Sequence, residues 1–443
     1  MIFAQSNVVN VVDDAGWMQQ LFVAGSCLLL FLSMALPTVP QLVLLKAGLF
    51  AALLAGVGLK CLTGTGSRLD PRIVLWTFSL STLGFLFVLK GFFAGNPGAA
   101  AALPVHVLWP LTFTLWIAGL SRPRTVSALH CTLIVATLFI GLYGCLYVLT
   151  ELEVLPDVGL ASALSLGWEG QGFGTDEGYP KMAIAGMNSL PFLAPYVMAS
   201  AAVQSGSAQR HPGWRILTWV ACAAAWFTVL AAGRRALFLV VLLTPGLILL
   251  ACCLQPAHER VTARRRVIKF TAVLALAAVV LFAGFTLIAE LDLHELWDHF
   301  GAGFDLSTQT PDGDAVERRQ QFIELSRGWL ERPLFGAGLG ASVLGSIRSE
   351  TTPWAYELYY LAILYQTGLV GCLAYAAGIA WIFWCGLKII GQGGDDAQIM
   401  IPLLVGFCGL LIANGTNPYL GKFDEMWTIF VPLSAINGRL LPA

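Results

Sequence analysis

Long apolar runs alternate with polar segments along almost the whole chain. A helix needs about 20 apolar residues to cross the hydrocarbon core of a bilayer. Runs of this kind fall near residues 17–36, 40–60, 73–94, 101–120, 126–149, 182–203, 215–232, 236–254, 267–289, 357–388, 398–414 and 424–440. The pattern therefore predicts an all-α polytopic membrane protein with about twelve transmembrane helices.

The connections between the predicted helices differ in charge. Cytoplasmic loops of membrane proteins carry an excess of lysine and arginine. Counting each loop by the span that it follows, the even-numbered loops and the segment after the last span hold Lys60, Arg68, Arg72, Arg122, Arg124, Arg210, Arg215, Arg260, Arg264, Arg265, Arg266, Lys269 and Arg439. This asymmetry predicts that both termini are cytoplasmic and that the odd-numbered loops face the periplasm or the cell exterior.

Composition agrees with a membrane protein and disfavours other classes. Hydrophobic residues make up 57% of the chain and charged residues 12%, whereas a soluble domain carries about 25% charged residues. The formal net charge of -1 lacks the basic surplus that is typical of nucleic-acid-binding proteins. Cysteine and histidine show no metal-binding spacing. We therefore expect a protein with no nucleic-acid partner, no metal and no cofactor.

Two of the predicted outer loops are long, and long loops with their own structure are usually functional. The first covers residues 150–181 and is acidic, and the second covers residues 290–356. The second loop divides the chain into spans one to nine (1–289), the loop itself, and spans ten to twelve (357–443).

The larger loop has recognisable parts. Residues 290–300 could form a short helix. The segment 314–333 is amphipathic, with Val316, Ile323 and Leu330 at helical spacing, and therefore predicts a helix. A glycine-rich turn at 336–345 ends this part of the loop.

Arg234 and Arg235 lie in a tight outer turn between spans seven and eight, where the charge rule disfavours them. A bound anion would explain this placement, because ionisable groups at membrane depth are candidates for function. Alternatively, both side chains reach lipid headgroups or pair with an acidic side chain of the long loops. The same reasoning applies to Lys181, which lies where the acidic loop enters span six.

Three further charged residues belong to the large loop and its end. Arg318 and Arg319 lie in the amphipathic segment, where arginines on a solvated helix face are common. Glu357 lies at the mouth of span ten, followed by an almost wholly apolar run. A glutamate in a first helical turn often interacts with the helix dipole, and a carboxylate at a membrane surface can also serve as a general base.

The segment ERPLFGAGLG (331–340), followed by YELYYLAILYQTGLVG (356–371), resembles the O-antigen ligase and O-antigen polymerase superfamily of bacterial inner-membrane glycosyltransferases. That family often has a histidine motif that ends in G-x-x-G. Gly368 and Gly371 match the two glycines, whereas Glu357 stands at the position of the histidine. Arg318, about fifteen residues before the proline of PLFG, also matches the family pattern.

Two weaker similarities lie earlier in the chain. The turn Gly233-Arg234-Arg235-Ala236 resembles the small-residue–arginine turn of the family, with Arg235 the better match. The segment GMNSLPFLAPYV (186–197) resembles the asparagine-containing start of span six, with Lys181 near a position where the family often has arginine.

The resemblance implies a GT-C-like fold and a donor glycan carried on a polyprenyl diphosphate, with a glycan or lipid acceptor. It implies metal-independent, inverting transfer at the periplasmic face of the inner membrane. It implies catalytic roles for Glu357, Arg318 and Arg235, and substrate-binding roles for Arg234, Lys181, Arg319 and Tyr360.

Three functions remain open at this point. Glutamate in place of the family histidine favours a polymerase of O-antigen or exopolysaccharide repeats, which could work with a chain-length regulator. The first alternative is a ligase that transfers the glycan to lipid A core. The second is a transporter or flippase of lipid-linked sugars, although the sequence shows no inverted repeat of the kind common in transporters.

Overall fold

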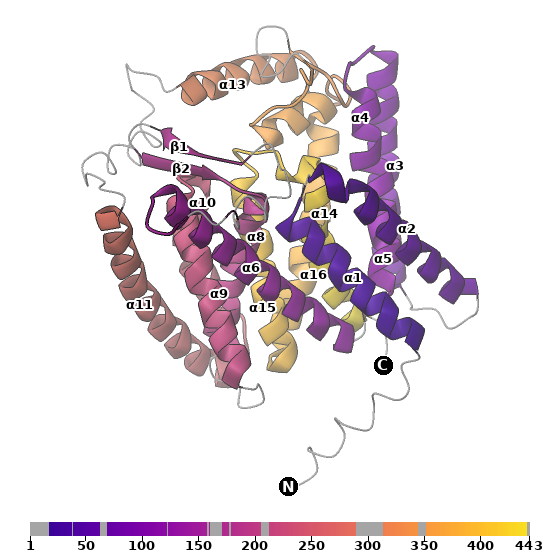
Figure 1. Ribbon diagram of the computed structural model, residues 1–443. Helices are drawn as coiled ribbons and strands as arrows, with labels where there is room; N and C mark the ends of the chain where they lie inside the picture. The colour runs from indigo at the N-terminus through magenta and orange to yellow at the C-terminus, as the bar shows by residue number, and fades with distance from the viewer. Residues whose placement is uncertain are drawn as a thin grey trace.

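The computed structural model describes residues 17–37, 39–62, 69–121, 123–156, 159, 171–176, 179–204, 212–288, 313–343 and 351–440. Within these ranges the chain is a bundle of helices with a single two-stranded sheet (Figure 1). The first half comprises α1 (Trp17–Ala35), α2 (Pro40–Leu62), α3 (Pro71–Phe93), α4 (Ala99–Leu103), the π-helix η1 (Pro104–Leu108), α5 (Trp109–Ala118), α6 (Pro123–Glu151), β1 (Gly172–Asp176) and β2 (Tyr179–Ala183).

The second half of the chain adds the central helices and the segments that cover them. It comprises the 3-10 turn η2 (Met187–Ser189), α8 (Leu190–Gln204), α9 (Pro212–Ala231), α10 (Arg235–Cys253), α11 (Ala257–Ile288), α13 (Gly313–Glu331), α14 (Tyr359–Gln392), α15 (Gly394–Ala413), the 3-10 turns η3 (Tyr419–Gly421) and η4 (Phe423–Glu425), and α16 (Trp427–Leu440).

Eight helical stretches of the described chain are long and apolar enough to cross a bilayer. They are Pro40–Leu59, Pro71–Phe93, Ala99–Ala118, Thr125–Glu151, Pro212–Ala231, Arg235–Cys253, Tyr359–Gln392 and Gly394–Ala413. The chain is thus a helical membrane protein, as the apolar runs predicted. The other four predicted spans correspond to α1, α8, α11 and α16, which are helical but fall outside these eight.

The predicted start of span six is wrong by several residues. Residues 182 and 183 belong to β2, which pairs antiparallel with β1, and α8 begins only at Leu190. The remaining predicted helix at 290–300 lies outside the described residues.

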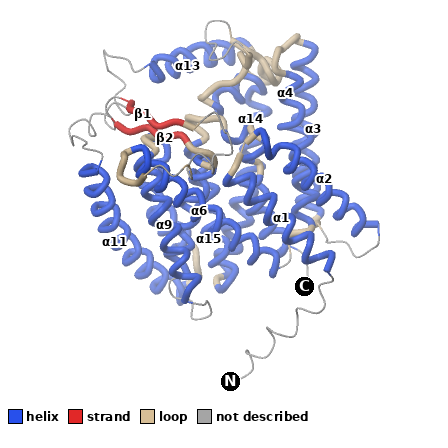
Figure 2. Tube along the Cα trace, in the orientation of Figure 1, coloured by secondary structure: helices blue, strands red, loops and turns tan. Residues whose placement is uncertain are grey.

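The two ends of the bundle differ, and we name them by what they carry. The loop end carries α13 and the β1–β2 hairpin, and α13 lies across the helices below it (Figure 2). The basic end carries the starts of α3, α9 and α11 with Arg72, Arg215 and Arg260 (Figure 1). Helix α1 begins and α16 ends at this basic end.

Small residues allow the central helices to approach one another closely. A Cβ at Gly406 of α15 would lie 2.8 Å from the carbonyl oxygen of Phe192 in α8, and one at Gly144 of α6 would lie 2.5 Å from Thr228 of α9. Close packing of this type is common between membrane helices, which gain little from burying apolar surface against one another in lipid. The tightly packed α8–α15 core supports the loop end from below.

Candidate functional site

The glycine-rich turn after α13 fits into a kink of α14. Gly368 has φ 65 and ψ -169 inside α14, and a Cβ there would meet the Leu334 carbonyl oxygen at 2.3 Å. The two segments exchange four backbone hydrogen bonds. Leu369 N donates to Pro333 O at 2.9 Å, Val370 N to Leu334 O at 3.1 Å, Ala337 N to Tyr365 O at 2.9 Å, and Gly338 N to Gln366 O at 2.8 Å. The kink thus frees backbone groups of α14 that the turn then satisfies.

The other side of the glycine-rich turn is held by the end of α3 and the residues after it. Lys90 Nζ donates to the carbonyl oxygens of Phe335 and Gly336, at 2.9 and 2.7 Å. Gly98 N donates to Gly340 O at 3.0 Å. Gly340 has φ +75, and a Cβ there would lie 2.1 Å from the Gly98 carbonyl carbon. The motif glycines therefore position a turn between α3 and α14.

Helix α13 docks on the segment that leads into α14. Gln321 is fully buried, and its Oε1 accepts hydrogen bonds from the backbone N–H groups of Glu357 at 2.9 Å and Leu358 at 3.5 Å. Leu325, one turn further on, is fully buried in a small core with Tyr356 and Tyr365. Burial raises the pKa of the Tyr356 phenol to about 12, although its oxygen accepts a hydrogen bond from Val343 N.

The amphipathic helix predicted over 314–333 is confirmed, but its apolar side is not the buried side. Val316, Ile323 and Leu330 are 47%, 47% and 68% exposed. The buried side carries Gln321 and Leu325 instead. Gln321 accepts a hydrogen bond from Glu357 N, and Leu325 packs with Tyr356 and Tyr365. Periodicity alone found the helix and missed its docked face.

Arg318 and Glu357 form an ion pair on this docked side. Arg318 Nε donates to Glu357 Oε2 at 2.7 Å, and the two side chains are 33% and 8% exposed. Arg318 lies one turn before Gln321 on α13, so the same helix face holds the backbone and the side chain of Glu357. Charge-assisted hydrogen bonds of this length are among the stronger ones in proteins. The Glu357 carboxylate is thus held between α13 and the start of α14, with its Oε2 against the Arg318 guanidinium.

Arg234 is held in a different way, in the turn before α10. Its Nη1 donates to Asn188 Oδ1 at 3.1 Å, and it lies beside the phenol of Tyr419. Burial raises the pKa of that phenol, and the positive charge of Arg234 opposes the rise. Within the described parts of the chain, no carboxylate forms an ion pair with Arg234. Among these described residues, its polar contacts are with the neutral side chains of Asn188 and Tyr419. Arg235 begins α10 and is half-buried.

The turn between α15 and α16 was assigned no role by the sequence. Asp424 in this turn forms an ion pair at 3.0 Å with Lys46 of α2, and both side chains are nearly buried. Its neighbour Glu425 is 1% exposed, and its Oε2 has no hydrogen-bond partner among the described residues. Burial raises the pKa of the Glu425 carboxyl well above its ordinary range, and Lys422 opposes the rise. Burial therefore favours the neutral form of Glu425, which lies near Tyr419.

Tyr359 and Tyr360 lie between the Glu357 segment and the turn that joins α15 to α16. They follow Glu357 at the start of α14, and the Tyr360 hydroxyl donates to Leu411 O at 2.6 Å near the end of α15. Both line an apolar cavity of about 190 Å³ whose wall also includes Leu420 and Met426 of the α15–α16 turn. The cavity lies among α3, η1, α14 and α16 and has His106 and Tyr375 as a hydrogen-bonded pair at 3.1 Å.

The two remaining predicted site residues lie on the surface. Arg319 is exposed on α13, next to Arg318 but turned away from the Glu357 segment. Lys181 is exposed on β2. Neither position identifies a bound group, and their predicted roles in substrate binding stay predictions. Among the described residues, no group of three or more His, Cys, Asp or Glu side chains is placed to hold a metal ion.

Comparison with known proteins leaves the family open. The chain matches no protein-family model, and no curated protein matches it. The functional argument therefore rests on the residues and on the contacts described above.

Proposed function

We propose that the protein is a membrane glycosyltransferase that polymerises oligosaccharide repeats carried on a polyprenyl diphosphate. In this proposal the loop end faces the periplasm of a bacterial inner membrane, both termini are cytoplasmic and the fold is GT-C-like. The observation that carries the proposal is the Arg318–Glu357 pair, which joins a phosphate-binding type of side chain to a carboxylate at the mouth of a membrane helix.

The proposed reaction needs two complementary charges at one surface. A hydroxyl of the acceptor glycan attacks the anomeric carbon of the donor sugar, the new C–O bond forms, and the bond to the diphosphate breaks. The bonding electrons leave with the lipid diphosphate, and the hydroxyl proton passes to the Glu357 carboxylate. Direct displacement inverts the anomeric configuration.

The ion pair gives this reaction an order of events. The donor diphosphate offers the Arg318 guanidinium a second anion, and planar guanidinium groups suit phosphate oxygens well. When Arg318 moves to the diphosphate, Glu357 Oε2 loses its partner and becomes able to accept a proton. Donor binding thus activates the base, and the base stays neutralised while the site is empty.

Arg234 supports the same reaction from the start of α10. Its neutral partners Asn188 and Tyr419 leave its positive charge available to a growing negative charge. A preorganised positive group stabilises the leaving diphosphate without a rearrangement. Arg235 adjoins it, and we assign it to the same leaving group. The apolar cavity beside Tyr359 and Tyr360 gives the lipid chain of the donor a place below the site.

A reconstituted transfer assay tests the proposal. Purified protein in nanodiscs receives the lipid-linked oligosaccharide extracted from cells that lack this protein, and the products are separated by length. A ladder of longer lipid-linked glycans, formed without an ion gradient, supports the polymerase. Transfer only to added lipid A core makes the protein a ligase. Movement of the glycolipid across vesicles without bond formation makes it a transporter and contradicts the proposal.

A further inference from the structure

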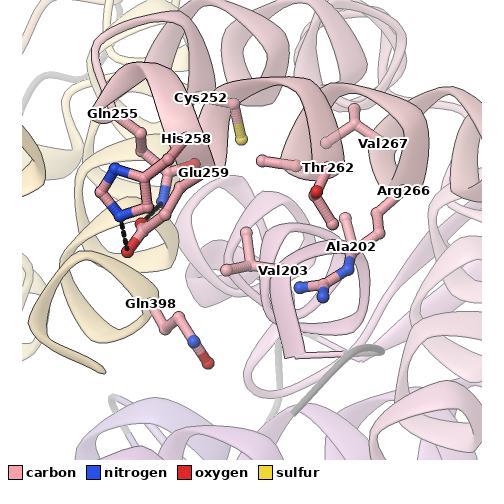
Figure 3. Close-up of a pocket in the computed structure, with 11 residues that line it drawn as sticks. Ala202, Val203, Cys252, Gln255, His258, Glu259, Thr262, Arg266, Val267 and Gln398 are labelled. Atoms are coloured by element: carbon pink, nitrogen blue, oxygen red, sulfur yellow. Dashed lines mark hydrogen bonds and ion pairs between the residues drawn. The ribbon is translucent and has the colours of Figure 1, made fainter. Parts of the chain in front are cut away.

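A second cavity, with a polar lining, lies at the basic end, far from the groups discussed so far. It has a volume of about 260 Å³ and is bordered by α8, α10, α11 and α15. Figure 3 shows its lining, with side chains of α11 on one side and Gln398 of α15 on the other. None of its residues belongs to the proposed transfer site, so the cavity needs its own explanation.

Two opposite charges line this cavity without meeting. Glu259, Thr262 and Arg266 recur on one face of α11, and the seven residue steps from Glu259 to Arg266 span about 10 Å of helix. Figure 3 shows the carboxylate and the guanidinium on opposite sides of Val203. In the part of the chain that the structure describes, no carboxylate pairs with Arg266, and only the ring of His258, at 3.7 Å, forms an ion-pair contact with Glu259.

The Glu259 carboxylate is fixed in place by neutral groups. It accepts hydrogen bonds from the backbone N–H of Gly394 at 3.0 Å and from the side-chain amide of Gln255 at 3.3 Å. These contacts attach α11 to the start of α15 and hold the carboxylate on the Gly394 side of the cavity. The cavity therefore has the negative charge of Glu259 on one side and the positive charge of Arg266 on the other.

Gln255 supplies an independent sign of a missing ligand. The residue is 5% exposed and lines the cavity, and its Oε1 has no hydrogen-bond partner among the described residues. Buried polar atoms are nearly always satisfied, so an unsatisfied acceptor calls for a donor. Its position beside Glu259 makes an ammonium N–H the fitting donor, because the carboxylate then supplies the opposite charge.

We infer that this cavity binds the headgroup of a membrane phospholipid that carries a primary ammonium group, of the phosphatidylethanolamine type. The phosphate lies against Arg266, with the Thr262 hydroxyl as a further donor. The ammonium lies against Glu259 and Gln255 Oε1. The site is at the level where α10, α11 and α15 end or begin, which is the level of headgroups for helices that span a bilayer. Exposed Leu250 on α10 and Leu254 directly after it offer the acyl chains an apolar surface nearby.

Other headgroups fit these residues less well. A phosphatidylglycerol headgroup has no cation for Glu259 and leaves that charge uncompensated. A phosphatidylcholine headgroup has a quaternary ammonium, which cannot donate a hydrogen bond to Gln255. The arrangement therefore predicts selectivity as well as binding.

Lipid retention measured by native mass spectrometry tests the inference. The full-length protein is equilibrated in an equimolar mixture of phosphatidylethanolamine, phosphatidylcholine and phosphatidylglycerol, then transferred to detergent and sprayed. We expect retention of phosphatidylethanolamine above the other two. Arg266→Gln should lower its occupancy by about tenfold, the equivalent of one charge-assisted hydrogen bond. Arg264→Gln is the matched control, because Arg264 is exposed on the same helix and does not line the cavity.

Three results would overturn the inference. The first is equal retention of all three lipids, and the second is an equal loss in the Arg264 and Arg266 variants. The third is binding of free phosphoethanolamine by protein that retains no lipid, which would assign the cavity to a soluble ligand. A thermal melt of each variant in detergent without added lipid separates loss of binding from loss of folding, since neither arginine has an ion-pair partner in the described structure.

Discussion

Arg318 and Arg234 are both arginines at the loop end, but their surroundings differ in one decisive respect. Arg318 is neutralised by Glu357 at 2.7 Å, whereas the contacts of Arg234 are to Asn188 and Tyr419, which carry no charge. A neutralised cation must exchange partners before it can bind an anion, and a cation held by neutral groups need not. The difference teaches that two arginines at the same end of the bundle can act at different moments of the proposed reaction.

The largest effect on the transfer rate is expected for Glu357, the proposed base of the Arg318–Glu357 pair. Glu357→Gln keeps the shape of the side chain and removes its ability to take a proton, so the transfer rate should fall by about 10²- to 10⁴-fold. Initial rates of glycan transfer in nanodiscs measure this. Glu324→Gln on α13 is the control, because the Glu324 carboxylate accepts a hydrogen bond from the side-chain amide of Gln320, one turn earlier on the same helix. Full transfer activity in Glu357→Gln would remove Glu357 from the chemistry.

A smaller but still large effect on the transfer rate is expected at Arg234, the arginine with neutral partners. Arg234→Gln should lower the transfer rate by about 10²- to 10³-fold, as for the loss of one preorganised donor to a developing negative charge. Arg327→Gln, an exposed arginine of α13, should leave the rate unchanged. If Arg234→Gln weakens donor binding while the rate at saturating donor stays normal, then Arg234 binds the ground state and does not act on the leaving group.

The glycine-rich turn should matter for stability, because it packs closely against the residues that follow α3. Gly340→Ala combines a positive φ with a contact of 2.1 Å to the backbone of Gly98, and we expect the melting temperature to fall by about 5 °C or more. Gly95→Ala is the matched control, because Gly95 has φ +72 but open space around it. Equal shifts for the two variants would show that backbone strain alone, and not the close approach of the turn, sets the cost.

The smallest effect is expected in the turn beside Arg234. Because burial favours the neutral form of the Glu425 carboxyl, its replacement by a neutral amide in Glu425→Gln should change the melting temperature by no more than about 2 °C. Asp424→Asn in the same turn breaks a buried ion pair with Lys46 and should cost clearly more. The opposite ranking in a thermal melt would mean that Glu425 is ionised in the folded protein.

Most of the membrane-spanning helices could be predicted from the sequence, because an apolar run long enough to cross a bilayer is a local property of the chain. The order of the motifs also identified Arg318, Glu357, Gly368 and Gly371 as candidate functional residues. Their contacts could not be predicted, since Arg318 and Glu357 are 39 residues apart and belong to different elements. The docked face of α13 is chosen by Gln321 and Leu325, against the apolar periodicity of the helix.

The turn between α15 and α16 shows where the sequence argument stopped short. Asp424 and Glu425 precede an apolar helix in the same way as Glu357 does, so the reasoning used for Glu357 applied to them equally. Only the fold brings Lys46 to Asp424, from 378 residues away in the chain, and Tyr419 to Arg234. A family resemblance directs attention to matched motifs and away from charges that no motif covers.

The exchange of Arg318 from Glu357 to the donor diphosphate is the central claim, and the affinity of Glu357→Gln for the donor tests it most directly. The variant frees Arg318, so the donor should bind more tightly than to the natural protein, by about fivefold for a partly exposed pair, while transfer collapses. The Kd can be measured by titrating nanodiscs with a labelled polyprenyl diphosphate. An unchanged or weaker affinity in Glu357→Gln would contradict the exchange and leave the pair with a purely structural role.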